Sequence, residues 1–171
     1  DPLALTRQAL DLLGDEPTPT RARALHWLAR VLGFAEHNQI AQAQDAAVEA
    51  LGLAEQLNLP RLASDIHTTL AGLEQNEGDD IDPTLVRAAA AAAKAGAATA
   101  ELRALTILGR VRMERGEFAA AEEAFDHAVR RAIATGRTWA PYGFDARFHR
   151  IQVAFVSGDW AKADELLAQP R

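Results

Sequence analysis

Residues Leu102 to Thr135 read LRALTILGRVRMERGEFAAAEEAFDHAVRRAIAT, and this stretch decides the fold. Large apolar residues recur at helical spacing on both sides of Gly116, and Gly109 and Ala121 stand among them as small residues. Two helices that cross closely need a small residue on one helix where the other presses in. Gly116 suits a helix end because glycine adopts the left-handed conformation without steric cost. The stretch therefore predicts two helices joined by a tight turn, with Glu117 opening the second helix.

The spacing within this stretch resembles the tetratricopeptide pattern of large and small residues. The matching positions are Leu105, Leu108, Gly109, Phe118, Ala121, Phe125 and Ala128. Arg112 stands where the pattern usually has a tyrosine. The resemblance implies one helix-turn-helix repeat.

Composition limits the classes of function. Alanine and leucine dominate, which favours an all-helical protein. The net charge of −6 gives no support for binding to nucleic acid or to an anionic membrane. Cysteine is absent, so the chain has neither a disulfide framework nor a thiolate metal site. No apolar run is long enough to span a bilayer.

Two features indicate where the chain comes from. It begins at Asp1 and its only methionine is Met113, so we expect a fragment of a longer protein. Arginine outnumbers lysine 16 to 2, and with abundant alanine this is typical of a GC-rich bacterial genome.

The rest of the chain reads as weaker copies of the same hairpin. We expect an orphan helix over 1–14 and helix pairs over 19–58, 60–96, 98–136 and 138–169. The expected turn anchors Asn38, Gly78, Gly116 and Gly158 lie 40, 38 and 42 residues apart. The whole chain, 1–171, is therefore predicted to be a single tetratricopeptide-like array, a right-handed α-solenoid of about nine helices.

Equivalent positions can be aligned between the repeats. Trp27 and Phe34 occupy the places of large aromatic residues in repeat one, and Trp160 and Ala163 match Phe118 and Ala121 in repeat four. Thr18 is expected to cap the helix that follows it, and Asp82 the helix that starts with Pro83. The alanine run 88–93 predicts very close helix packing.

One segment is more distinctive than the repeats around it. Residues 136–147 read GRTWAPYGFDAR, 158–160 read GDW, and 101–105 read ELRAL. Together they resemble the helical-repeat region of large bacterial LuxR-type, ATP-binding transcriptional regulators. That resemblance implies a cytoplasmic protein in which this array senses an inducer or partner between an ATPase domain and a helix-turn-helix domain. The chain itself has no phosphate-binding G-x-x-x-x-G-K-[ST] loop and no DNA-reading helix-turn-helix, so neither activity is carried over to it.

Metal and catalytic chemistry find little support. The histidines His26, His37, His67, His127 and His149 form no H-x-x-x-H pair. Glu123 and His127 are four residues apart and could touch a metal, but an ordinary surface pair is the better interpretation. Asp79, Asp80 and Asp82 lack calcium-loop spacing, and Ser64 and Ser157 lie in no nucleophile motif. We therefore expect no enzyme activity, no metal and no cofactor.

The arginines at 110, 112 and 115 could form a basic patch. Acidic residues at 101, 114 and 117 lie close to them in sequence, so a mixed, solvated face is the better interpretation.

The concave groove of the array is the place where a binding site is most expected, since solenoids usually bind along that surface. Residues there that packing does not require are free to bind a partner, although a merely hydrated surface is an equally simple alternative. The groove candidates are His67, Thr68, Arg103, Thr106, Arg110, Asp145, Phe148, His149 and Gln152.

The leading hypothesis is a non-enzymatic sensor module that binds a protein, peptide or small effector in this groove. The rival hypothesis is a structural spacer that couples an ATPase domain to a DNA-binding domain and has no ligand of its own. Leucines also mark both ends of the array: Leu3, Leu5, Leu12 and Leu13 at one end, Leu166 and Leu167 at the other. End-to-end self-association is therefore expected of the chain.

Overall fold

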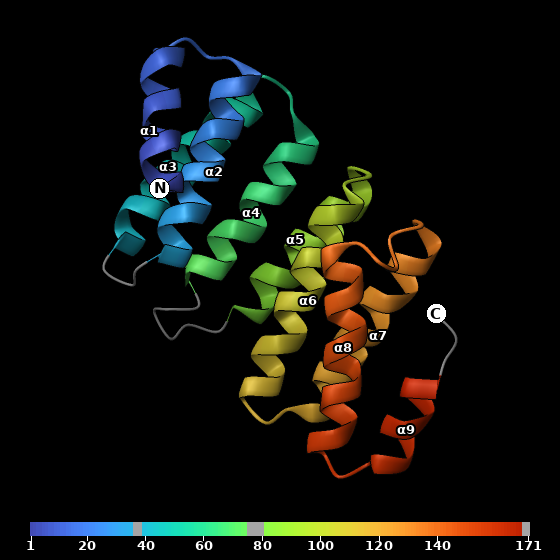
Figure 1. Cartoon of the computed structure of the whole chain (residues 1–171). Coiled ribbons are helices and arrows are strands. Elements are labelled where there is room, and N and C mark those ends of the chain that lie inside the picture. Colours follow the sequence, from blue (N-terminus) through green and yellow to red (C-terminus); the bar gives the residue numbers. More distant parts are fainter. Residues whose placement is uncertain (36–38, 75–80, 169–171) are drawn as a thin grey trace. The chain divides into compact units, whose positions relative to one another are not determined.

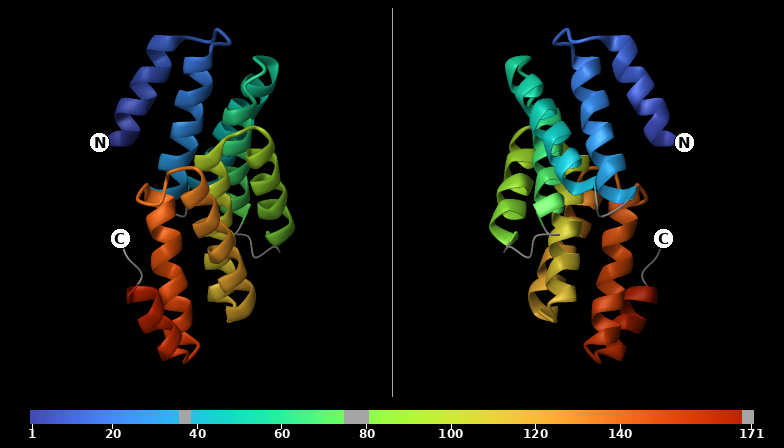
Figure 2. Two further views of the ribbon diagram at one scale, coloured as in Figure 1. Left: turned by 90° about the vertical axis from the view of Figure 1, so that its right-hand side faces the viewer. Right: turned by 90° about the vertical axis from the view of Figure 1, so that its left-hand side faces the viewer.

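The computed structural model describes residues 1–35, 39–74 and 81–168, and over these residues it contains helices and no strand (Figure 1). Both views in Figure 2 likewise show only coiled ribbons there. The helices are α1 Pro2–Leu13, α2 Pro19–Ala35, α3 Ile40–Gln56, α4 Pro60–Glu74, α5 Asp82–Lys94, α6 Ala98–Glu114, α7 Phe118–Ala134, α8 Pro141–Val156 and α9 Trp160–Ala168. The predicted all-α class is confirmed. The anchors Asn38 and Gly78, like His37, Asp79 and Asp80, lie outside the described residues.

The chain forms two compact units, and each is described by itself. Unit 1 comprises Asp1–Thr84 with Lys94–Ala97, and unit 2 comprises Leu85–Ala93 with Ala98–Arg171. Helices α1 to α4 in unit 1 and α6 to α9 in unit 2 pack against their neighbours in sequence, and α2 also meets α4 as α6 meets α8. Contacts between alternate helices are typical of stacked hairpins. None of the described helices is long and apolar enough to cross a membrane.

The predicted signals at Thr18, Gly116 and Gly158 operate in the structure, whereas α5 begins at Asp82 itself and not at Pro83 as predicted. The hydroxyl of Thr18 accepts a hydrogen bond from the backbone N–H of Arg21 at 3.2 Å, which caps α2. Gly116 and Gly158 follow α6 and α8 with φ angles of 78° and 85°, in the left-handed region that glycine tolerates best. The two turns therefore have the same construction, 42 residues apart.

Unit 1 is held together largely by small residues. The buried side chains of α3 are all alanines. Ala46, Ala47, Ala50 and Ala54 pack with Leu25, Ala29 and Ile66, and Ala43 packs with Leu32 and Leu73. At Gly33 in α2, an added Cβ atom would stand 2.6 Å from Cδ2 of Leu73 in α4. Because these positions carry a methyl group or no side chain at all, the helices of unit 1 can approach one another closely.

Trp27 does not fill the core of unit 1 as its spacing predicted. Its side chain is exposed, with the guanidinium of Arg30 5.4 Å from the ring centroid. The buried residues Leu25, Ala29 and Leu32 follow i, i+4, i+7 spacing, so they share one helix face and Trp27 points from the opposite side. The prediction for Trp27 was wrong because the buried face of α2 is rotated away from it. The side chain of Phe34 lies outside the described part of the structure.

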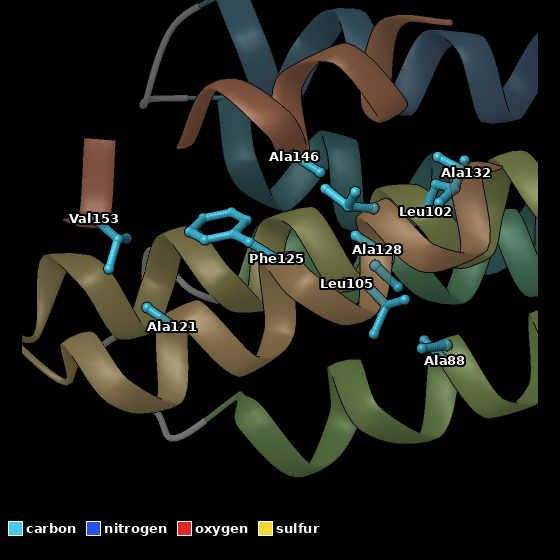
Figure 3. Packing of buried hydrophobic residues seen from close by; sticks show 12 residues of the cluster. Ala88, Leu102, Leu105, Ala121, Phe125, Ala128, Ala132, Ala146 and Val153 are labelled. Carbon is cyan, nitrogen blue, oxygen red and sulfur yellow. The ribbon is translucent and has the colours of Figure 1, made fainter. Parts of the chain in front are cut away.

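Phe125 of α7 is the central core residue of unit 2, with no exposed surface (Figure 3). It packs with Leu102 and Leu105 of α6, Ala121 and Ala128 of its own helix, and Ala146 and Val153 of α8. Ala121 is also fully buried. The small and large residues that identified the hairpin therefore lie in contact, as the sequence predicted.

The last hairpin follows the pattern only in part. Ala163 is buried against Ala154, as its match to Ala121 predicted, and Leu166 is buried beside it. Trp160, matched to the partly buried Phe118, is exposed instead. Helix α9 is nine residues long, Trp160 is its first residue, and its buried side chains are Ala163 and Leu166.

The distinctive segment 136–147 forms the turn into α8. Pro141 is the first residue of the helix, where its missing N–H costs nothing. A Cβ atom on Gly143 would stand 2.1 Å from the carbonyl oxygen of Arg137 and 3.0 Å from that of Thr138. No side chain fits there, so this part of the motif has a structural cause.

Candidate functional site

Four of the groove candidates lie together on α8 of unit 2. Nδ1 of His149 is 2.8 Å from the carbonyl oxygen of Asp145 and 3.3 Å from its carboxylate oxygen Oδ1. A carbonyl oxygen can only accept, so Nδ1 of His149 carries the proton and donates it. The imidazole stacks on Phe125 and meets Phe148 edge-on, with ring centroids 5.4 Å apart in both cases. His149 is therefore held in one orientation beside the exposed ring of Phe148, and Gln152 lies one turn further along.

The other candidates divide into buried and exposed residues. Thr68 and Thr106 are buried, and their hydroxyls donate to the carbonyls of Ser64 at 3.1 Å and Leu102 at 2.8 Å. Their hydrogen bonds are thus made within their own helices, and neither hydroxyl is presented to a ligand. Arg103 is also buried, at 5% exposure, whereas His67 and Arg110 are exposed.

An apolar strip on α8 was not recognised in the sequence. Phe144, Phe148 and Phe155 are 53–63% exposed, and with the partly buried Ile151 they follow one another by four, three and four residues. This spacing puts all four side chains on one helix face. We call these four residues the α8 strip. The opposite face of α8 carries the buried residues Ala146 and Val153, so the three phenylalanines point away from the core of unit 2. Ile151, at the border of the strip, packs against Ala154, Ala163 and Leu166.

A second aromatic group extends the strip at the start of α8. Trp139 is exposed, and its ring centroid lies 6.5 Å from that of Phe144. The guanidinium of Arg147 stands 4.9 Å from the Trp139 ring, within reach of a cation–π interaction. Trp139 is thereby held beside the strip rather than turned freely into water.

A cleft of about 580 Å³ opens between α5, α6 and α7. Its walls and floor are mostly apolar, and the residues that line it are Val86, Ala89, Ala90, Ala93, Glu101, Leu105, Leu108, Arg112, Glu123, Ala124, His127 and Arg131. The volume is within the range of small-molecule sites. Of the alanine run, Ala88 and Ala89 are buried in the core cluster with residues of α6 and α7, while Ala90 and Ala93 are exposed at the cleft.

Glu101 and Arg131 form a two-pronged ion pair in the cleft. Nε and Nη2 of Arg131 donate to the two carboxylate oxygens of Glu101 at 2.6 and 2.9 Å. The hydrogen bond and the negative charge of Glu101 raise the pKa of the Arg131 guanidinium above its ordinary value. Glu101 is buried, so its expected place on a mixed solvated face was wrong. Its partner is 30 residues away, beyond the reach of local sequence spacing.

Polar clusters elsewhere offer little for chemistry. In unit 1 the buried His26 lies 2.8 Å from the hydroxyl of Thr69 and 3.9 Å from a carboxylate oxygen of Asp65. Glu123 and His127 are both exposed at the cleft. Among residues 1–35, 39–74 and 81–168, no three histidine or acidic side chains converge where they could hold a metal ion.

Comparison with known proteins identifies the fold. No protein-family model matches the chain, and no curated protein matches it significantly. Solved structures do match. The crystal structure of BtubC (BKLC) from P. vanneervenii aligns with a TM-score of 0.71 and 16% identity over 96% of this chain and 66% of that chain.

The nearly identical TPR-like repeats of a kinesin light chain protein from Podosopora anserina align similarly. A point variant of that protein gives a TM-score of 0.64 at 19% identity, over 96% of this chain and 81% of that chain. A second structure of it gives 0.62 at the same identity. At such identities the likeness concerns the fold alone, and the fold of this chain is a tetratricopeptide-like helical repeat.

Proposed function

We propose that the chain is a non-enzymatic interaction module that binds a protein partner through the α8 strip. The observation that carries the proposal is the exposure of three phenylalanines, 53–63% each, on one face of a helix whose other face is buried. Contiguous exposed aromatic surface is costly in water and marks interaction sites. Aromatic side chains also dominate the energy of protein interfaces.

Polar groups beside the strip give such a partner something to recognise. Asp145 and His149 are held together at one border, and Arg147 lies at the other. The groove candidates Asp145, Phe148, His149 and Gln152 are therefore retained in the proposed site, with the exposed Arg110 of the same unit as the prediction of a further contact. The exposed His67 belongs to unit 1 and stays a separate prediction. Fixed polar groups around an apolar centre are the usual anatomy of a protein interface.

The resemblance of segment 136–147 to LuxR-type regulators favours a sensing role for this module. In that setting it is a cytoplasmic array that responds to an inducer or partner and acts on an ATPase domain and a helix-turn-helix domain. The alternative within the same setting is a spacer without a ligand. The exposed phenylalanines favour binding over spacing, since a spacer has no need of them.

Selection from a library of displayed helical peptides tests the proposal. The chain serves as bait, and the isolated binders are compared on wild type, on Phe148→Glu and on Val48→Glu. Val48 is equally exposed but lies on α3, so its variant controls for the added charge. We expect peptides that no longer bind the Phe148→Glu variant and still bind the Val48→Glu variant. Binders indifferent to both changes, or none, would contradict a docking role for the strip.

The cleft of unit 2 supports a second candidate, the binding of a small effector. Its volume and its largely apolar lining, with the Glu101–Arg131 pair at the wall, fit a small amphipathic molecule. A thermal-shift screen of metabolites tests this, because a ligand that prefers the folded state raises Tm. Ala90→Trp should abolish any such shift by filling the cleft. Ala91→Trp, on the neighbouring exposed residue that does not line the cleft, should keep it.

A further inference from the structure

We propose that the partner of the α8 strip is a second copy of this chain, with the two α8 helices packed antiparallel about a two-fold axis. The inference rests on the proposed function of the strip and names its occupant. Four observations support it: the burial of the equivalent residues on α6, the spacing of residues along the strip, the exposed area of the strip, and the contrast with other exposed apolar residues.

The equivalent residues of α6 lie in the core. Phe144, Phe148 and Phe155 lie 42 residues after Leu102, Thr106 and Met113, the same interval that separates Gly116 from Gly158. Leu102 and Thr106 are buried, and Met113 is partly buried against the cluster that contains Ala146 and Val153 of α8. The same face is therefore covered within the fold on α6, whereas its phenylalanines are exposed on α8.

The spacing of residues along the strip is the same in both directions. Steps of four, three and four residues read identically from either end, so a reversed copy presents its side chains at matching heights. Phe144 then meets Phe155 of the second copy, and Phe148 meets Ile151. Each layer in the middle combines one large ring with one smaller side chain, which keeps the distance between the helices even. A parallel pair would place Phe148 against Phe148 and Ile151 against Ile151 of the second copy. The distance between the two helices would then have to differ between these layers.

The exposed area suits a weak dimer. Phenylalanine and tryptophan side chains bury 150–250 Å² when fully covered, so the three strip phenylalanines and Trp139 expose roughly 100 Å² each. Two copies would remove about 800 Å² of aromatic surface, before their flanks are counted, against roughly 1,000 Å² for a stable interface. This area lies at the low end for specific interfaces, where complexes are weak or transient, so we expect a weak dimer.

Other exposed apolar residues are less suited to the same role. Leu5 and Leu12 on α1 are exposed, but Ala9 between them is small and Leu3 and Leu13 are partly buried. At the other end Leu166 is buried against α8, and Leu167 is exposed but stands on a helix of nine residues. The predicted self-association is thus better supported through the α8 strip than through the ends of the array.

Sedimentation equilibrium across a wide concentration range is the first test. We expect a monomer–dimer equilibrium for wild type and for Val48→Glu. Phe148→Glu should raise the dissociation constant at least about 30-fold, as loss of a hot-spot residue does. Unchanged circular dichroism of Phe148→Glu shows that the fold is intact. Ile133→Glu, at an exposed residue of α7, is a second control.

Disulfide trapping tests the orientation, since the natural chain has no cysteine. In the antiparallel pair, residues 144 and 144 of the two copies are separated by about 16 Å along the helices, too far for a disulfide. Phe144→Cys alone and Phe155→Cys alone should therefore stay uncrosslinked, and a mixture of the two should crosslink. Crosslinking of either variant alone, and not of the mixture, would overturn the antiparallel arrangement.

The outcomes separate this inference from the proposed function. A strict monomer at about 100 μM, or growth into open chains, overturns the second copy as partner. If displayed peptides still require Phe148 in that case, the strip remains a docking site for another helical protein. If neither self-association nor peptide binding depends on Phe148, both proposals fail.

Discussion

Gly109 of α6 lies against the ring of Phe125 of α7: a Cβ atom on residue 109 would stand 2.6–2.8 Å from three ring atoms. Real Cβ atoms are hardly ever found at such distances, so the two helices can cross here only because residue 109 has no side chain. The closeness of this crossing buries Phe125 completely.

Gly109→Ala is expected to destabilise the protein by about 1–3 kcal/mol, because the fully buried ring of Phe125 cannot move aside. Gly52→Ala in α3 is the matched control, since a Cβ atom there meets nothing within 4 Å. It should stabilise by roughly 0.5–1 kcal/mol through helix propensity. Urea denaturation measures both. Adding Phe125→Leu to Gly109→Ala should recover part of the loss, and strictly additive effects would show that the two residues do not compete for space.

Ala121→Leu should likewise cost about 1–3 kcal/mol, since the residue is fully buried in the core of unit 2. Ala119→Leu, two residues earlier on the exposed side of α7, should leave the stability nearly unchanged. Equal melting temperatures for the two variants would mean that the repeat frame has been placed wrongly.

How much of the fold the sequence could predict depends on the size of the residues concerned. Positions such as Gly109 and Ala121 were identified because a small residue among large ones has few explanations besides a close crossing. Trp27 was misassigned because a tryptophan suits a core and an exposed cation–π contact equally well. Only the i, i+4, i+7 spacing of Leu25, Ala29 and Leu32 shows which face of α2 is buried.

The candidate site was predicted only in part. Asp145, Phe148 and His149 belong to one helix, so local spacing was enough to place them together. The pairing of Glu101 with Arg131 depends on the register of two helices 30 residues apart, which no local pattern contains. Thr68 and Thr106 were misread because a threonine hydroxyl can satisfy itself within its helix, and a polar residue then need not face water.

Breaking the pair from the Arg131 side should cost more than breaking it from the Glu101 side. Arg131→Leu leaves a buried carboxylate without its counter-charge, at about 3–5 kcal/mol. Glu101→Leu leaves Arg131, whose side chain is 37% exposed and can turn to water, so its cost should be clearly smaller. Thermal unfolding of the two variants measures the difference, and the reverse order would contradict the burial seen at Glu101.

The pH dependence of the Arg131 contribution follows from the sign of its shift. A base whose folded pKa is raised contributes stability below its unfolded value and loses it as pH rises through the folded value. Since the pKa of Arg131 is raised from an already high value, that loss lies far above neutral pH. The destabilisation by Arg131→Leu should therefore persist as pH rises from about 7 to about 9. A cost that fades as pH rises across that range would show that the ion pair is not its cause.

Gly143→Ala should lower Tm strongly, because the added Cβ atom would overlap the carbonyl oxygen of Arg137, and backbone cannot yield as a flexible side chain does. Gly72→Ala in α4, where the space around the added atom is open, is the control. If Gly143→Ala has the same Tm as wild type, the turn before α8 does not depend on the close approach of residue 143 to the carbonyl oxygen of Arg137.

The alanines of α5 give the cleft an adjustable size. Ala89, Ala90 and Ala93 line one wall, and a longer side chain at Ala90 or Ala93, both exposed, would extend into open space without displacing a helix. Single substitutions can therefore narrow, divide or fill the cleft while the hairpins keep their packing. For protein engineering, this wall of methyl groups is a place where a new binding cavity can be shaped one residue at a time on an unchanged scaffold.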